Sequence, residues 1–272
     1  MKVAALQMVS GPRPDDNMAQ ARRLLEEAAA QGAELAVLPE YFGFMGARDT
    51  DKLALREPLG DGPLQRMLST AARELGIWVV GGTLPLQSGS ATQVRNTSLA
   101  FDPAGERVAR YDKIHLFRFD NGREFFDEAH VIEAGADTAR FDLTARDGSV
   151  WRVGLSVCYD LRFPELYRQH ASAGADLLLV PSAFTHTTGQ AHWEVLLRAR
   201  AVENLAYVLA PAQGGTHETG RRTWGHSMLV DPWGAVLAQR AEGAGVVCGE
   251  IDPAYLRQVR QQLPALDHRV LQ

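Results

Sequence analysis

The sequence predicts an α/β fold in which two similar halves pack sheet against sheet around one core. Candidate strands and helices alternate along the chain, which is typical of a mostly parallel sheet covered by helices. Segments of the first half recur in the same order in the second half, which indicates an internal duplication. The strands are apolar almost throughout, as expected where both faces of a sheet are buried.

The first half is expected to begin with a strand, a helix and a second strand. Gly11, Pro12 and Pro14 end the first strand, and the helix after them carries apolar residues at the spacing of one helical face. An Asp-Pro-Ala-Gly turn predicts the hairpin that closes this half. The expected elements are strands 2–9, 35–38 and 77–81, helices 15–31 and 61–75, and hairpin strands 97–101 and 107–111.

The second half repeats this order. Pro164 stands in the first turn of a helix, where its missing N–H does no harm. The expected elements are strands 151–157, 177–180, 207–210, 227–230 and 236–238, and helices 163–172, 190–203 and 253–262.

The two halves also match residue by residue. Segment 32–42 (GAELAVLPEYF) aligns with 174–184 (GADLLLVPSAF) at an offset of 142 positions. At an offset of 129, segment 98–105 aligns with 227–234, and 78–80 aligns with 207–209. Three matches in one order favour duplication over chance. Since no linker divides the halves, we expect residues 1–272 to form a single domain.

Composition narrows the class of protein. The chain of 272 residues is 46% hydrophobic, which suffices for a core without staples. With only two cysteines a disulfide framework is excluded, and we expect a reducing, cytoplasmic setting. The net charge of −5 argues against a nucleic-acid partner. No apolar run reaches the ~18 residues of a membrane span, and the apolar N-terminus is too short for a signal peptide.

Cys158 is the strongest candidate for chemistry. It closes the apolar strand 153–157 and precedes a helix start, the usual position of an exposed nucleophile. Helix N-terminal amides and a nearby cation would favour its thiolate. The alternative is a buried, inert cysteine. That alternative is preferred for Cys248, which lies in mid-strand with no polar neighbour before Glu250.

Glu40 and Lys113 are two further candidates. Glu40 follows Leu38-Pro39 at a strand end, the edge where ligands collect in parallel sheets, and its aromatic neighbours would desolvate it for general base catalysis. Lys113 lies among apolar residues and could stabilise an oxyanion or a thiolate. Taken alone, Glu40 could equally be a solvated loop residue and Lys113 a surface lysine.

Other catalytic schemes find little support in the sequence. It has no HExxH or Cys-x-x-Cys pattern, so no metal site is expected, and its glycine pairs lack a nucleotide-binding spacing. Gly-x-Ser-x-Gly is absent. A Cys–His dyad stays open, because its members need not be neighbours in sequence.

Glu40, Lys113 and Cys158 are separated by 73 and 45 positions and together resemble the catalytic triad of the nitrilase superfamily of carbon–nitrogen hydrolases. The resemblance spans nearly the whole chain. The matching segments are 38–40 (LPE), 111–116 (YDKIHL), 158–165 (CYDLRFPE), 189–204 and 224–234. It implies a four-layer αββα sandwich with pseudo-twofold symmetry and a homodimer that extends the sandwich. Glu128 matches a second family glutamate that would position lysine and substrate, although it could also be a plain loop residue.

The resemblance also implies a thiol mechanism without a metal or an organic cofactor. Glu40 would take the proton of Cys158, and the thiolate would attack an amide carbonyl. Lys113 and the backbone N–H of Tyr159 would hold the oxyanion. Glu40 would then protonate the leaving ammonia and activate the water that hydrolyses the thioester.

Within the superfamily, segments 212–217 (AQGGTH) and 222–227 (RTWGHS) resemble deaminated-glutathione amidases more than ω-amidases. This implies a small amide of an α-keto acid that bears a carboxylate. Arg162 or Arg118 could bind that carboxylate, although Arg162 could equally form a structural salt bridge. Candidate pocket walls are Tyr41, Phe42, Phe184, Thr185 and His192.

Four alternatives remain at this point. An ω-amidase and an N-carbamoyl amino acid amidohydrolase would use the same three residues. A nitrile substrate is less favoured, because Cys158 is followed by Tyr159-Asp160 and not by Trp-Glu. An inactive scaffold of the same fold would be expected to have lost at least one of Glu40, Lys113, Glu128 and Cys158.

Overall fold

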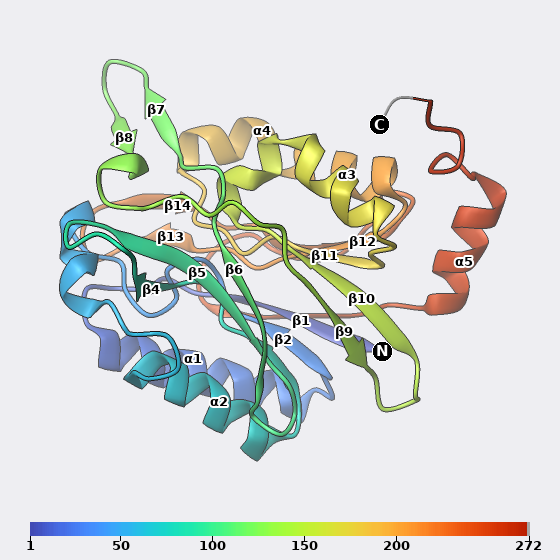
Figure 1. Cartoon of the computed structure of the whole chain (residues 1–272), viewed down its shortest axis with the longest axis horizontal. Helices are drawn as coiled ribbons and strands as arrows, with labels where there is room; N and C mark the ends of the chain where they lie inside the picture. The colour runs from blue at the N-terminus through green and yellow to red at the C-terminus, as the bar shows by residue number, and fades with distance from the viewer. Residues whose placement is uncertain (271–272) are drawn as a thin grey trace.

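The computed structural model describes residues 1–270 and consists of four layers (Figure 1). Two β-sheets pack face to face. The helices α1 (Pro14–Ala30) and α2 (Pro63–Leu75) cover the outer face of one sheet, and α3 (Pro164–Ser172) and α4 (His186–Asn204) cover the other. One large cluster of buried residues draws on both sheets, so they share a core. The predicted αββα sandwich is confirmed.

The first sheet contains β1 (Lys2–Gln7), β2 (Leu35–Val37), β3 (Trp78–Val80), β4 (Leu84–Gln87), β5 (Val94–Phe101), β6 (Arg107–Asp112) and β17 (Gly245–Glu250). Their order is β17-β1-β2-β3-β5-β4, with β6 paired to β5. The centre of the sheet is parallel, because α1 carries the chain from β1 to β2 and α2 carries it from β2 to β3. Near the far end of the chain, β17 returns and pairs antiparallel with β1.

The second sheet contains β9 (Arg140–Thr144), β10 (Val150–Leu155), β11 (Leu177–Leu179), β12 (Tyr207–Ala210), β15 (Ser227–Val230) and β16 (Val236–Arg240). Their order is β16-β15-β12-β11-β10-β9. The strands β10, β11 and β12 are parallel, with α3 and α4 as their crossovers.

The predicted duplication is visible in this topology. β2 and β11 come from the two matching segments, and each lies between two parallel neighbours in its own sheet. The hairpins β5–β6 and β15–β16 come from the second matching pair, and both are antiparallel. A Pro follows each of β2 and β11, so Glu40 and Ser182 occupy equivalent places beyond the carboxyl ends of two parallel strands.

Alternate residues of the parallel strands face different layers. In β1, Val3 and Ala5 join the cluster between the two sheets. Ala4 and Leu6 join a second cluster beneath α1 and α2. Both faces of the strand are therefore buried, which explains why residues 3–6 are apolar at four consecutive positions and not at alternate ones.

The helices begin where capping groups allow. α1 has Pro14 in its first turn followed by Asp15 and Asp16, which suit the positive end of the helix dipole. α4 begins four residues earlier than the apolar pattern predicts, because the hydroxyl of Thr185 accepts a hydrogen bond from the N–H of Thr188 (3.3 Å) and caps the helix there.

Several short elements were not predicted, because runs of three to seven residues are too short to show a clear period in hydrophobicity. They are the strands β4 and β9 named above, the hairpin strands β7 (Arg118–Asp120), β8 (Phe125–Asp127), β13 (Gly214–Thr216) and β14 (Arg222–Trp224), and the 3-10 helices η1 (Asp49–Leu55), η2 (Glu128–His130) and η3 (Cys158–Arg162). The β7–β8 hairpin projects beyond the layers (Figure 1). The last helix, α5 (Pro253–Gln262), has the predicted bounds. Within residues 1–270, no helix is long and apolar enough to cross a bilayer.

Candidate active site

Cys158 lies just beyond β10, as the first residue of η3. Its φ is +52°, a left-handed conformation that costs a residue with a Cβ on the order of 1–3 kcal/mol. Two hydrogen bonds hold this turn. The Cys158 N–H donates to the Pro181 carbonyl (3.0 Å), and the Val157 N–H donates to the Asp160 carboxylate (2.8 Å). The turn places the thiol where the core between the sheets borders a pocket.

Asp160 is fully buried and joins the cysteine turn to the segment that carries Lys113. Its Oδ2 accepts from the Val157 N–H and from the Tyr111 hydroxyl (2.7 Å). Its Oδ1 accepts from the His115 N–H (3.1 Å) and lies 2.7 Å from the His115 Nδ1. Burial and the charge of Asp160 raise the pKa of Tyr111, which keeps that hydroxyl a donor.

Glu40 stands three residues beyond the end of β2 and is only 1% exposed. Its Oε1 accepts from the Lys113 Nζ and the Asn96 Nδ2, each at 2.9 Å. Its Oε2 accepts from the N–H of Ala183 (2.9 Å), which belongs to the other half of the duplication. Because a carboxylate offers about four acceptor sites, Oε2 retains one for a further proton donor.

Lys113 follows β6 and is equally buried, between two carboxylates. Its Nζ lies 2.9 Å from the Glu40 Oε1, and 3.0 and 2.8 Å from the two oxygens of Glu128. Glu128 also accepts from the Phe117 N–H (2.7 Å) and the Tyr41 hydroxyl (2.8 Å). These contacts fix the ammonium at one point, and the three side chains together carry a net charge of −1.

These charges set the protonation of the thiol. Burial raises the pKa of Cys158, Glu40 raises it further, and Lys113 does not offset them, so the thiol is neutral at rest. The sequence had favoured a thiolate. Burial lowers the pKa of Lys113, but Glu128 and Glu40 hold it well above its usual value. Burial raises the pKa of Glu128, but Lys113 and the Phe117 N–H hold it below its usual value.

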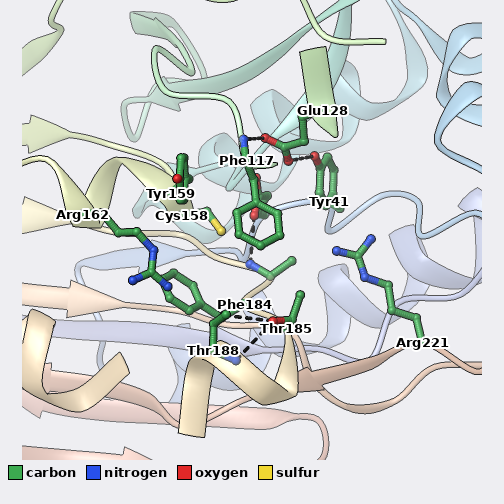
Figure 2. A pocket seen from close by; sticks show the side chains of 12 residues that line it. Tyr41, Phe117, Glu128, Cys158, Tyr159, Arg162, Phe184, Thr185, Thr188 and Arg221 are labelled. Atoms are coloured by element: carbon green, nitrogen blue, oxygen red, sulfur yellow. Dashed lines mark hydrogen bonds between the residues drawn. The ribbon is translucent and has the colours of Figure 1, made fainter. Parts of the chain in front are cut away.

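The pocket above Cys158 is small and partly open to solvent. Figure 2 shows Arg162 and Arg221 on opposite sides of it, with the cysteine sulfur and the Phe117 ring between them. Its lining residues are Glu40, Tyr41, Phe117, Glu128, Cys158, Tyr159, Arg162, Ala183, Phe184, Thr185, Thr188 and Arg221.

Several of the predicted wall residues line this pocket, namely Tyr41, Arg162, Phe184 and Thr185. Phe42, His192 and Arg118 do not line it, and for Phe42 the prediction was wrong. Phe42 is fully buried under α1 and α2, because Tyr41 adopts a φ of +58° and turns the chain between them. His192 is exposed on α4, where its Nδ1 lies 3.2 Å from the Arg162 Nη1. Arg118 lies on β7 with its side chain 76% exposed.

Four lining residues were not predicted from the sequence, namely Phe117, Ala183, Thr188 and Arg221. Phe117 follows the Lys113 motif and belongs to an aromatic group with Tyr159 and Phe126. Arg221 lies in the β13–β14 hairpin, whose position no sequence pattern fixes. Within the described part of the chain, no group of three or more His, Cys, Asp or Glu residues is arranged to hold a metal ion.

Comparison with known proteins gives one consistent answer. The profile of the carbon-nitrogen hydrolase family matches residues 2–261. A deaminated glutathione amidase from Synechocystis sp. is 44% identical over 270 residues, which are 98% of this chain and 97% of that protein. The human deaminated glutathione amidase is 42% identical over 98% of this chain and 81% of its own length.

Solved structures agree with these relatives. The crystal structure of the Caenorhabditis elegans NitFhit protein superposes with a TM-score of 0.90 at 39% identity, over 99% of this chain and 65% of that longer chain. An amidase from Nesterenkonia sp. AN1 superposes with a TM-score of 0.77 at 29% identity, over 97% of this chain and 98% of its own. In that structure acrylamide is attached by Michael addition to the active-site cysteine.

Proposed function

The chain belongs to the carbon–nitrogen hydrolase family and is an amidase, and from that premise we propose that Cys158 is its nucleophile and deaminated glutathione its substrate. One observation carries the proposal. A strained cysteine stands at a small pocket whose buried base is a Glu–Lys–Glu cluster. Backbone strain of this kind is typical of functional sites. We propose that residues 1–272 form a single domain. The second half contributes the Ala183 N–H that binds Glu40, and both halves contribute to the core.

The first step is attack by sulfur on the amide carbonyl. Glu40 accepts the thiol proton as the C–S bond forms, because the neutral thiol needs a base and Oε2 of Glu40 has an acceptor site left. The carbonyl oxygen gains negative charge. Lys113, which is charged and held on three sides by carboxylate oxygens, and the backbone N–H of Tyr159 stabilise that oxyanion.

The second step breaks the C–N bond. Glu40 returns its proton to the nitrogen, the amine leaves, and a thioester remains on Cys158. Glu40 then takes a proton from water as the water oxygen attacks the thioester carbonyl. The C–S bond breaks, Glu40 returns the proton to the sulfur, and the acid leaves. Deaminated glutathione is an α-keto acid joined by an amide bond to cysteinylglycine, so cysteinylglycine is the amine released from it. Ammonia leaves only from primary amides such as α-ketoglutaramate.

Arg162 is proposed to hold the keto acid carboxylate. It lies four residues beyond Cys158 in the same 3-10 helix, so it keeps a fixed position relative to the thioester. It has no carboxylate partner among residues 1–270. Its contacts are the His192 ring nitrogen and the faces of Tyr159 and Phe184. The structural salt bridge considered for Arg162 is therefore not observed within those residues.

The test is product release from three substrates by wild type, Cys158→Ala and the matched control Cys248→Ala. Deaminated glutathione is assayed for cysteinylglycine, α-ketoglutaramate for ammonia, and an N-carbamoyl amino acid for ammonia. We expect wild type and Cys248→Ala to prefer deaminated glutathione, and Cys158→Ala to lose roughly 10³-fold or more. Turnover by Cys158→Ala at the wild-type rate would contradict the mechanism. A preference for either other substrate would contradict the substrate assignment.

A reducing compartment such as the cytoplasm suits this chemistry, since the nucleophile works only as a free thiol. Both cysteines are free in the structure. Cys248 lies on β17 and packs against the cluster under α1 and α2, away from the pocket.

We also propose a homodimer formed through the outer face of α4. Val195 on α4 and Trp233 in the β15–β16 turn are 62% and 58% exposed, which is unusual for large apolar side chains in one area. Arg198 ties the helix to the turn by donating to the Gly234 carbonyl (2.8 Å). We expect sedimentation to give a dimer for wild type and a monomer for Val195→Asp. The control Val150→Asp, at a similarly exposed site on β10, should remain dimeric. A monomeric wild type would contradict this proposal.

A further inference from the structure

Arg221 stands at the active-site pocket, yet the mechanism above does not use it. It lies between β13 and β14, directly before the first residue of β14. Its side chain lines the same pocket as Cys158 and Arg162. In Figure 2 it approaches from the side opposite Arg162, next to Tyr41.

The guanidinium of Arg221 lacks an acceptor within residues 1–270. No carboxylate in that range lies within salt-bridge distance of it, and its Nε is buried without a hydrogen-bond partner. Its guanidinium lies over the Phe126 ring, 5.3 Å from the ring centre. This cation–π contact does not give the buried Nε a hydrogen-bond acceptor. A buried, unpaired donor on a charged group is costly, so the residue is suited to receive an anion from outside the chain.

The acidic residues near Arg221 already have other partners. Glu218 pairs with Arg13 (2.8 Å), and Glu128 is bound by Lys113 and Tyr41. Rearrangement of Glu128 would cost Lys113 its strongest contacts. The missing acceptor is therefore expected from the substrate, and arginine is the side chain best shaped to bind a carboxylate through two N–H groups.

The charge of the site supports the same conclusion. Glu40, Lys113 and Glu128 leave the base of the pocket with a net charge of −1, which repels an anionic substrate. Arg162 offsets one carboxylate. A substrate with a second carboxylate on the other side of the scissile bond needs a second cation, and Arg221 supplies it from the opposite wall.

We propose that Arg221 binds the carboxylate of the amine portion of the substrate, and thereby selects amides whose leaving amine is itself a carboxylate-ended dipeptide. This inference rests on the proposed function. Arg162, fixed in the nucleophile's own helix, is assigned to the acyl side, which leaves Arg221 for the amine side. A dipeptide reaches at most about 7 Å from the scissile nitrogen, which is compatible with a small pocket.

The test compares deaminated glutathione with its analogue in which the terminal glycine carboxylate is a carboxamide. Wild type is expected to prefer the carboxylate by about 10- to 100-fold in kcat/KM, the usual effect of a charged hydrogen-bonded pair. Arg221→Met should lower kcat/KM for the carboxylate substrate by that factor and bring the two substrates close together. Arg222→Met, the exposed neighbour on β14, should keep the wild-type preference.

The outcomes separate the two proposals. If wild type hydrolyses neither substrate nor α-ketoglutaramate, the proposed function fails. If wild type is active and Arg221→Met keeps the full preference for the carboxylate, the inference about Arg221 fails. The inference also fails if Arg162→Met removes the preference for the carboxylate over the carboxamide and Arg221→Met does not. A smaller loss on α-ketoglutaramate than on deaminated glutathione in Arg221→Met supports the inference, because α-ketoglutaramate has no carboxylate on its amine.

Discussion

Replacing Asp160 with asparagine tests whether the cysteine turn depends on one buried carboxylate. Each carboxylate oxygen faces a backbone N–H: Oδ2 accepts from Val157 and Oδ1 from His115. Asparagine offers one acceptor and one donor in the same space. Whichever way the asparagine amide is oriented, its NH₂ group faces one of these backbone N–H donors. The side chains of Tyr111 and His115 can rotate to suit the new amide, but the backbone N–H groups cannot.

The expected cost follows from that count. One buried backbone N–H without an acceptor costs about 1–3 kcal/mol, and the remaining hydrogen bonds lose their charge-assisted part, about 1 kcal/mol more. The free energy of unfolding of Asp160→Asn should fall by roughly 2–4 kcal/mol. Because Val157 precedes the strained Cys158, the turn should shift, and a displacement of about 1 Å can lower kcat by about 10²-fold.

Urea unfolding, kcat and the alkylation rate of Cys158 measure these effects together. Asp142→Asn is the matched control, since that carboxylate is half exposed and pairs only with Arg152 (3.1 Å). Its removal should cost less than about 1 kcal/mol. If Asp160→Asn matched Asp142→Asn in stability, kcat and alkylation rate, the role given to Asp160 would be refuted.

Three further perturbations follow from the structure. Burial lowers the pKa of His170 from 6.5 to about 4, so its contribution to stability is complete above pH 6.5 and is lost as the pH falls toward 4. Between pH 7 and 5 the free energy of unfolding should fall by about 2 kcal/mol more in wild type than in His170→Leu. Gly82→Ala would set a Cβ 2.0 Å from the Pro39 carbonyl oxygen at a φ of +46° and should cost at least about 2 kcal/mol in thermal unfolding. Glu128→Gln removes a negative charge from Lys113, so the pKa of that lysine should fall and the alkaline limb of kcat/KM should move to lower pH, with roughly a 10- to 100-fold loss of kcat.

Each of these has a control and a contrary result. An unchanged pH dependence in His170→Leu would remove that histidine from the acid response. Gly76→Ala has a similar φ of +62° with open space around it and should cost about 1 kcal/mol, so equal losses at Gly76 and Gly82 would show that the contact with Pro39 is unimportant. For Glu128→Gln, a pH profile that coincides with wild type would contradict the coupling to Lys113.

The layers of the fold could be predicted because their causes are local. The Gly-Ala-x-Leu segments before β2 and β11 carry the strand pattern, the Pro that ends it and the offset that reveals duplication. The contact of Glu40 with Lys113 could be expected only from the resemblance, since the two are 73 positions apart and follow two strands of the first sheet, β2 and β6, that are not neighbours.

The rest of the site depends on tertiary placement. Phe42 is adjacent to a pocket residue, and only the left-handed turn at Tyr41 decides that it packs away from the pocket. Arg221 lies beside Arg222 in a short hairpin of exposed appearance, and nothing in the sequence distinguishes the arginine at the pocket from the one in solvent. Such choices are made by long-range packing, which a periodic pattern does not record.

The pairing of β1 with β17 has a consequence for how the chain matures during synthesis. Lys2 pairs opposite Glu250, so one edge of the first sheet stays open until almost the whole protein has been translated. During that time β1 presents unpaired backbone groups on an apolar strand, which is a template for association between nascent chains. Ribosome-bound fragments that stop short of residue 245 should therefore need chaperone protection, which the finished chain, with β17 in place, no longer needs.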